Sequence, residues 1–207
     1  NSSLGALIRS IDTMFNKKST KISKIFSENS FKLLFNNLPK VLKKNNSLEY
    51  WSNMQWGAYL SIAALLNSSN GPAAAIGYYL STNYNIPQGL GYAISGIRFF
   101  ERNHEKGYHE YFKLYDLIEK KPNKKKLSKK EKSKLVIYDL LKILKYNKLT
   151  LKKTNIPMNQ NEKILKFISK SFKKVTSNNI IISNKSNNPI NLNEQDLKII
   201  IKNILER

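Results

Sequence analysis

The side chains that most often carry chemistry in proteins are few in this sequence. Cysteine is absent, so the chain has no disulfide and no thiolate metal ligand. The two histidines, His104 and His109, are five residues apart, a spacing that does not place both on one face of a helix. We therefore predict solvent-facing polar side chains there rather than a metal site. A serine nucleophile needs a histidine base within reach, and neither histidine lies in the uncharged part of the chain.

Nucleotide-binding and acid–base signatures are also scarce. No Gly-rich phosphate loop follows a strand, so a nucleotide site of the Rossmann or P-loop kind is not encoded. The acidic residues Asp12, Glu28, Glu49 and Glu101 are isolated in the sequence. Composition and spacing alone thus indicate a basic helical domain and no particular reaction.

The strongest compositional feature is a net charge of +22, from 36 Lys and Arg against 14 Asp and Glu. The lysines are spread along the chain, with one dense block at 120–134. Two explanations stay open: drift in a composition rich in Lys, Asn and Ile, with solvated helix faces, or a functional basic surface that binds nucleic acid or another polyanion. We favour drift. The candidate polyanion contacts are Lys124, Lys125, Lys126, Lys129 and Lys130.

The elements that must position these residues are helices. Apolar residues recur at spacings of three and four over 4–15, 22–42, 48–66, 105–120, 128–146, 160–175 and 197–205. No segment shows sustained alternation, so we predict an all-α fold, a multi-helix bundle. Pro39 should end or kink its helix. The helix at 48–66 is rich in aromatic and small residues, and we expect it to be buried on more than one side.

Local signals place some helix ends. Ser128 is typical of an N-cap, and Asn193 with Asp196 three residues later is a capping pattern. The run Ile180–Ile182 suggests a short extended piece in an Asn-rich loop.

Residues 71–96 carry no charged side chain, and this run predicts two helices joined by an elbow at 83–87. Pro87 suits the first turn of the second helix. Gly89, Gly91 and Gly96 then give that helix a face almost without side chains. We expect this pair to form the floor of a cleft, around which the rest of the chain is arranged.

The length of 207 residues is enough to bury a core, and we treat 1–207 as one domain. No apolar run reaches the ~18–20 residues that a membrane span needs. The N-terminus lacks a signal-peptide pattern, because Arg9 interrupts the apolar stretch from Leu4 to Ile11. We therefore expect a cytoplasmic protein with no membrane association.

The run Asn83–Ala93, NYNIPQGLGYA, resembles the signature of the iron-containing (group III) alcohol dehydrogenases, a family similar to dehydroquinate synthase. In that signature a segment tyr-x-x-pro-his-gly follows a helix bearing two histidines four residues apart. Segments at 5–12, 34–41, 53–58 and 188–197 resemble other parts of that family in the same order. The resemblance covers the chain from Gly5 to the C-terminus and implies the family's C-terminal helical domain.

In that family an Asp, a His four residues later and two more His fourteen residues apart bind Fe²⁺ or Zn²⁺. The resemblance places these ligands at Gly5, Arg9, Ala74 and Gln88. Gly and Ala have no donor atom, and Arg9 cannot deprotonate. The family's second His on the same helix corresponds to Tyr78. We therefore expect no metal and no other cofactor.

The same positions suggest a different ligand. If Arg9 lies in the old metal pocket near Tyr78 and Gln88, it could bind a carboxylate or phosphate by a bidentate contact. The alternative is that Arg9 points to solvent from the first helix.

Three functions stay open. The first is a metal-free relative that is not catalytic alone, a pseudoenzyme or a structural or interaction module. The second is half of an NAD(P)-dependent oxidoreductase, because the family places a dinucleotide-binding domain before the helical one. We expect that domain to be absent here, either removed, lost or carried by another chain. The third is a basic module that binds a polyanion. The expected partners are accordingly a nucleotide-binding domain, a second copy of the chain, or a polyanion.

Overall fold

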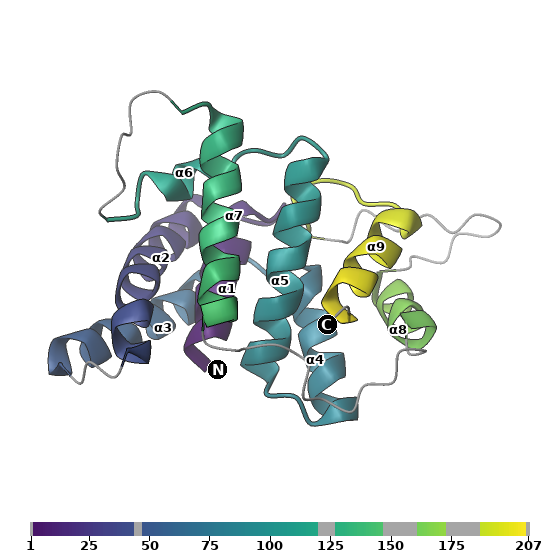
Figure 1. Cartoon of the computed structure of the whole chain (residues 1–207), viewed down its shortest axis with the longest axis horizontal. Coiled ribbons are helices and arrows are strands. Elements are labelled where there is room, and N and C mark those ends of the chain that lie inside the picture. Colours follow the sequence, from purple (N-terminus) through teal and green to yellow (C-terminus); the bar gives the residue numbers. More distant parts are fainter. Residues whose placement is uncertain (1, 44–46, 120–126, 147–160, 173–186, 206–207) are drawn as a thin grey trace.

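The computed structural model describes residues 2–43, 47–119, 127–146, 161–172 and 187–205, and within these ranges it contains helices and no strand (Figure 1). The predicted all-α fold class is confirmed. In chain order the helices are α1 (Ser2–Phe15), α2 (Lys21–Leu42), α3 (Leu48–Leu66), α4 (Pro72–Tyr84), α5 (Gln88–Glu105), α6 (Phe112–Tyr115), α7 (Lys129–Tyr146), α8 (Asn161–Phe172) and α9 (Glu194–Leu205).

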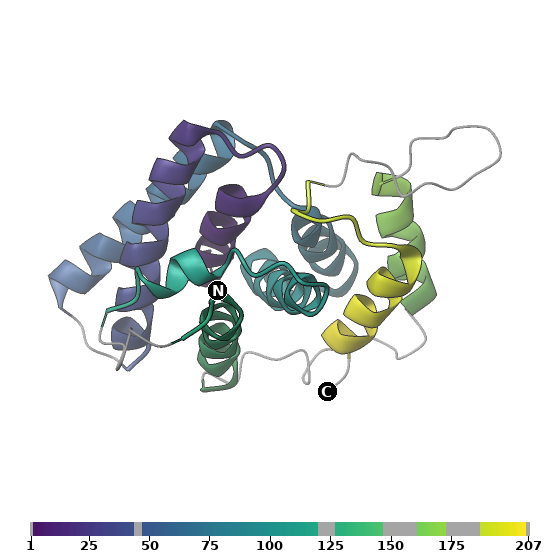
Figure 2. The same ribbon diagram turned by 90° about the horizontal axis from the view of Figure 1, so that it is seen from above.

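Helix α5 lies at the centre of the bundle and packs against α1, α4, α7 and α9. Seen from above, α2 and α3 lie side by side on one flank, and α8 and α9 lie together on the other (Figure 2). The buried apolar residues come from all of these helices and form one continuous core.

Glycines let α5 approach its neighbours closely. A Cβ atom added to Gly77 of α4 would lie 2.7 Å from the backbone nitrogen of Tyr92 in α5, and one on Gly96 of α5 would collide with Ile8 of α1. The two helices predicted in 71–96 form as α4 and α5, although Pro87 is the N-cap of α5 and not a residue of its first turn. The chain leaves α4 through Asn85, whose φ of 53° lies in the left-handed region.

The helix predicted at 105–120 is wrong. α5 continues to Glu105 and ends in a Schellman turn, in which the Gly107 N–H donates to His104 O (3.0 Å) and the Tyr108 N–H to Asn103 O (2.9 Å). Beyond it, successive turns with bonds between residues three apart lead into the four-residue α6. These turns bury Tyr111, Leu114, Tyr115 and Ile118. Buried residues in consecutive turns therefore have the same sequence spacing as the apolar face of a helix, which explains the wrong prediction.

Two details of α2 and α3 need comment. Of the two effects predicted for Pro39, an end of the helix is wrong, because α2 continues to Leu42, the end of its predicted range. α3 is not buried on more than one side: it packs mainly on α2 and α1 and buries only a narrow face, whereas Trp56, Tyr59 and Leu66 are exposed.

The predicted caps of α7 and α9 are confirmed. Ser128 Oγ accepts the Glu131 N–H (3.2 Å), and Asn193 Oδ1 accepts the Asp196 N–H (2.9 Å). The run Ile180–Ile182 and the segment of Lys124, Lys125 and Lys126 lie outside the described residues. None of the helices in the described ranges combines the length and hydropathy that a bilayer span requires.

Candidate functional site

A cleft of about 630 Å³ opens between α1, α3 and the start of α5. It contains polar groups from the first turns of α1 and α5, opposite an aromatic wall from α3. Its lining residues include Gly5 and Arg9 of α1, Trp51, Gln55 and Tyr59 of α3, and Gln88 and Tyr92 of α5.

The cleft is lined where α1 and α5 cross, and no residue of α4 lines it, so α4 and α5 do not form its floor together as predicted. A Cβ atom added to Gly5 would lie 2.8 Å from Gly89 Cα, closer than real Cβ atoms come. The opposing atom is backbone, so it cannot rotate away as a side chain would. The two helices therefore meet through a pair of glycines, and no side chain fits at position 5 without separating them.

Arg9 is the cationic group of the cleft. Its side chain is half-buried, and Nη1 donates a hydrogen bond to Ser61 Oγ of α3 (3.2 Å). Arg9 has no ion pair among the described residues, so its positive charge is not neutralised by a carboxylate there.

Behind the cleft, the buried carboxylate of Asp12 joins three segments. Its Oδ2 accepts the Gly71 N–H and the Tyr92 hydroxyl, both at 2.7 Å. Burial raises the pKa of Asp12 to about 6, although both hydrogen bonds act to lower it. Burial and the neighbouring Asp12 raise the pKa of Tyr92 well above its usual range, whereas the charge of Arg9 acts in the opposite direction.

No sequence pattern pointed to this arrangement, because Asp12 is isolated from the other acidic residues along the chain. The one available signal was that Asp12 is an acidic residue on the apolar side of an amphipathic helix.

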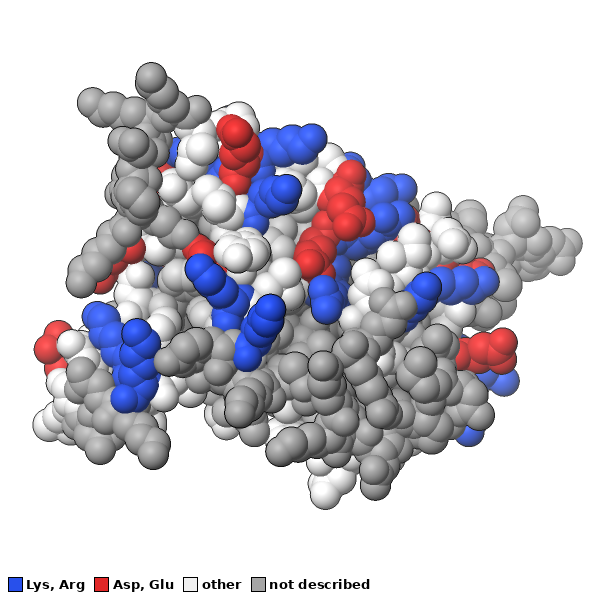
Figure 3. Space-filling model, viewed as in Figure 1, with Lys and Arg blue, Asp and Glu red and all other residues white. Residues whose placement is uncertain are grey.

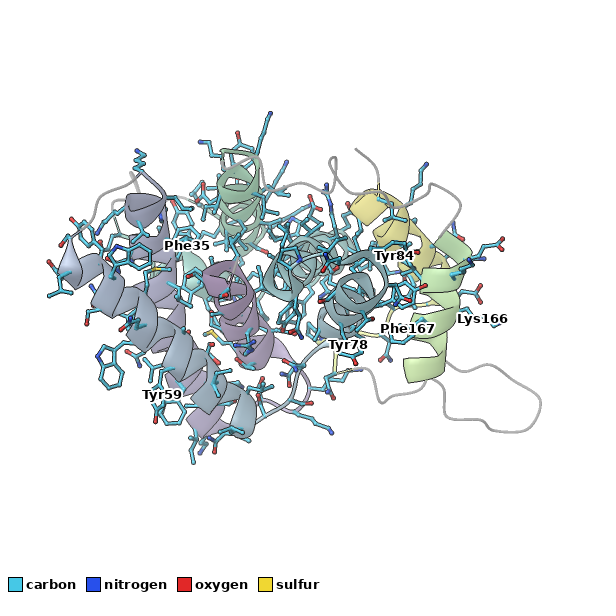
Figure 4. All side chains as sticks on the ribbon, turned by 90° about the horizontal axis from the view of Figure 1, so that it is seen from below. Phe35, Tyr59, Tyr78, Tyr84, Lys166 and Phe167 are labelled. Carbon is cyan, nitrogen blue, oxygen red and sulfur yellow. The ribbon has the colours of Figure 1, made fainter. Side chains whose placement is uncertain are left out.

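The structure brings together some of the predicted site residues. Gly5, Arg9 and Gln88 line the same cleft, so Arg9 does not simply point to solvent. Ala74 and Tyr78 lie on α4 and are not among the lining residues of the cleft; Tyr78 is 56% exposed. Figure 4 shows Tyr78 on α4 and Tyr59 on α3 at separate places in the bundle.

The side chains at these positions do not fit a divalent metal. Gly5 and Ala74 carry no donor atom, Arg9 carries a permanent positive charge, and the Gln88 amide oxygen alone would be a weak ligand. Within the described ranges, no three His, Cys, Asp or Glu side chains lie close enough together to hold a metal ion.

The two histidines behave differently from the prediction. They are not independent solvent-facing groups: their Nδ1 atoms are 3.3 Å apart and their ring centroids 4.7 Å apart. Sequence spacing missed this pair because α5 ends between the two histidines, at a turn in which Gly107 has a positive φ.

The described candidates for polyanion contact, Lys129 and Lys130, are exposed at the start of α7. Figure 3, in the orientation of Figure 1, shows basic side chains over the face that α7 presents. Lys129 lies over the Phe112 ring, 5.0 Å from its centroid.

Several solved structures share this fold. A 1,3-propanediol oxidoreductase matches with a TM-score of 0.81 at 16% identity, covering 98% of this chain and 50% of that one. An alcohol dehydrogenase from Oenococcus oeni matches with a TM-score of 0.80 at 15% identity (98% and 50% covered). An iron-containing alcohol dehydrogenase from Thermotoga maritima gives 0.71 at 19% (98% and 48%). The chain thus spans about half the length of these structures.

A search of curated protein sequences found no match. The family model described as "Fe-containing alcohol dehydrogenase family, C-terminal" matches residues 1–205. With the helical fold and the match of nearly the whole chain to half of each solved relative, this establishes that the chain belongs to the Fe-containing alcohol dehydrogenase family and corresponds to its C-terminal domain.

Proposed function

We propose that this chain is a metal-independent member of its family, without hydride-transfer activity of its own, whose cleft binds a small organic anion through Arg9. The observation that carries the proposal is the Arg9 guanidinium, which lines the cleft with no ion pair among the described residues. It occupies a position that the family resemblance assigns to a metal ligand.

The argument against a metal is electrostatic and steric. A divalent ion would meet the positive charge of Arg9, which does not deprotonate in proteins. The contact between Gly5 and Gly89 leaves no room for a carboxylate from α1. In the family's chemistry the metal polarises the substrate oxygen, so a chain that cannot hold it loses that step.

The argument for an anion rests on the donors that surround the cleft. A guanidinium presents paired N–H groups that match a carboxylate or phosphate. The Gln88 amide and the hydroxyls of Ser2 and Ser3 offer further donors, and Trp51 and Tyr59 supply an apolar wall. The volume of about 630 Å³ lies within the range of roughly 300–1,000 Å³ typical of small-molecule sites. An aromatic carboxylate or phosphate suits these groups best.

The chain offers a built-in reporter for this binding. Its two tryptophans are Trp51, which lines the cleft, and Trp56, which does not. In a Trp56→Phe background, titration with benzoate or phenyl phosphate should give a saturable change in Trp51 fluorescence. Arg9→Gln should weaken this binding at least about tenfold, as expected for loss of a charge-assisted contact.

The matched control is Arg98→Gln, the same substitution on α5 outside the cleft, which should leave the affinity unchanged. An equal affinity in the Arg9→Gln protein would contradict the assignment of Arg9.

The metal-independent part of the proposal has a separate test. The test is equilibrium dialysis against Zn²⁺ or Fe²⁺ with a His104→Ala/His109→Ala variant, in which the histidine pair cannot act as a competing metal ligand. This variant should retain no stoichiometric amount of either ion. Retention of one ion per chain in that variant would contradict it, whatever the outcome with anions.

A further inference from the structure

The junction of α5 and α7 holds a cluster of groups that the cleft does not use. His104 stands in the last turn of α5, and the turn at Gly107 brings His109 back against it. The His104 Nδ1 atom is 3.3 Å from His109 Nδ1 and 2.9 Å from Ser133 Oγ of α7. Ser133 is fully buried, so the histidine pair is fixed against α7 at this point.

Two lysines of α7 flank this contact. Lys130 lies three residues before Ser133 and Lys134 directly follows it, and the positive charges of both lysines act on His104. Both are exposed, and neither has an ion pair among the described residues.

The nearby carboxylates are already paired with other cations. Glu105 accepts from Arg102 (2.8 Å) and Glu110 pairs with Lys113 (2.6 Å). The junction therefore has an excess of positive charge that these acids do not balance.

The histidines add a proton-dependent charge. Burial lowers the pKa of His104, and the charges of His109, Lys130 and Lys134 lower it further, with Glu105 opposing. If both rings were protonated, two N–H donors would face each other across 3.3 Å, an arrangement that needs an acceptor between them. Lys130 and Lys134 would repel a divalent cation, whereas they would attract an oxyanion, which could also accept hydrogen bonds from protonated histidines.

We propose that the α5–α7 junction binds a phosphate group, taking up protons from solvent as it does so, through four side chains: His104, His109, Lys130 and Lys134. The positive charges of the two lysines attract the phosphate group. The histidines join as donors once the bound oxygens favour their charged form.

The chain has only two histidines, so their ring proton signals in an NMR titration report on this junction alone. In the full chain, sodium pyrophosphate should move the midpoint of at least one histidine titration upward by about half a pH unit or more, because a neighbouring anion favours the protonated ring. Sodium chloride at equal ionic strength is the reference.

Lys130→Gln/Lys134→Gln should raise the midpoint without ligand, since two repelling charges are gone, and abolish the pyrophosphate response. Lys142→Gln/Lys145→Gln makes the same change in net charge at the other end of α7 and should keep the response. Helicity by circular dichroism confirms that each variant is folded.

A parallel titration with a short oligothymidylate separates two sources of phosphate. A response to pyrophosphate identifies a small phosphate ligand, and a response to the oligonucleotide alone identifies a nucleic-acid backbone. No response to either, or an equal response in Lys130→Gln/Lys134→Gln, overturns the proposal.

Discussion

Asp12 is the residue on which the packing behind the cleft depends. Its carboxylate links α1 to the N-cap of α4 through Gly71 and to α5 through Tyr92. Position 71 must be glycine for this contact, because any side chain would collide with the carboxylate. Burial also destabilises the charged form of the Asp12 carboxyl group, so folding favours its protonation.

The pH dependence of stability follows from that preference. The pKa of Asp12 is about 6 in the folded chain and 3.8 without the fold, so between these values the native state binds more protons than the unfolded state. The free energy of unfolding therefore falls by at most about 3 kcal/mol as pH rises through this window. Above the window Asp12 causes no further decline. Asp12→Asn cannot titrate, so we expect its stability to lack this decline in urea unfolding measured from pH 4.5 to 7.5.

Glu28→Gln serves as the control, since Glu28 pairs with Lys32 on the surface of α2. Its pH profile should run parallel to that of the parent chain. A decline of equal size in Asp12→Asn would show that another group is responsible.

Among the single elements, α5 ends in a turn whose conformation depends on Gly107. Gly107 adopts a φ of +91°, and space around its Cα is open, with no atom within 4 Å of an added Cβ. A substitution there tests backbone conformation alone, without steric collision. The turn decides where α5 stops and whether the two histidines meet.

Gly107→Ala should destabilise the chain by about 1–2 kcal/mol, the cost of a left-handed conformation for a residue with a Cβ. Gly107→Asn should cost clearly less, because Asn visits this region more readily. Urea unfolding at neutral pH measures both. Equal stability of the Ala variant and the parent would mean that the turn rearranges at little cost.

The aromatic residues of α3 are more exposed than its composition predicted. Its aromatic residues looked like core from composition, yet Trp51 and Tyr59 are exposed and line the cleft. Aromatic and small residues in α3 therefore did not indicate a helix buried on more than one side.

In the whole molecule, polar contacts join α9 and the segment before it to α5. Arg102 donates from Nε (3.0 Å) and Nη2 (2.7 Å) to Asp196 Oδ1 of α9. Asn103 and Asn188 exchange two side-chain hydrogen bonds at 3.0 and 2.8 Å. Burial acts to raise the pKa of Asp196, but the Asn193 N–H and Arg102 outweigh it and lower the pKa.

Arg102→Gln should cost about 3 kcal/mol of stability, because it leaves the carboxylate of Asp196, 2% exposed, without its main partner. Arg98→Gln, one turn earlier on α5, breaks only a partly exposed pair with Glu101 and should cost less than about 1 kcal/mol. Chemical denaturation of the two variants side by side checks the difference. Similar losses would show that Asp196 is well satisfied without Arg102.

Much of the fold was predictable because its signals are local. Helical periodicity, the caps at Ser128 and Asn193, and the Pro87 start each depend on residues within one or two turns of each other. The order of short segments along the chain pointed to the family for the same reason. The sequence also determined that positions 5, 9 and 74 offer no metal donor, since that depends on side-chain chemistry alone.

Only the tertiary structure decided which of these residues meet. It placed Arg9 and Gln88 in one cleft but left Tyr78 outside it, and it joined His104 to His109 through a turn at Gly107. It also made Asp12 a buried link between three segments. The physical reason for the cleft and for the Asp12 contacts is that they join residues 50 or more positions apart and depend on how closely helix backbones approach. The glycines that allow this approach can be read from the sequence, but the helix that each of them faces cannot.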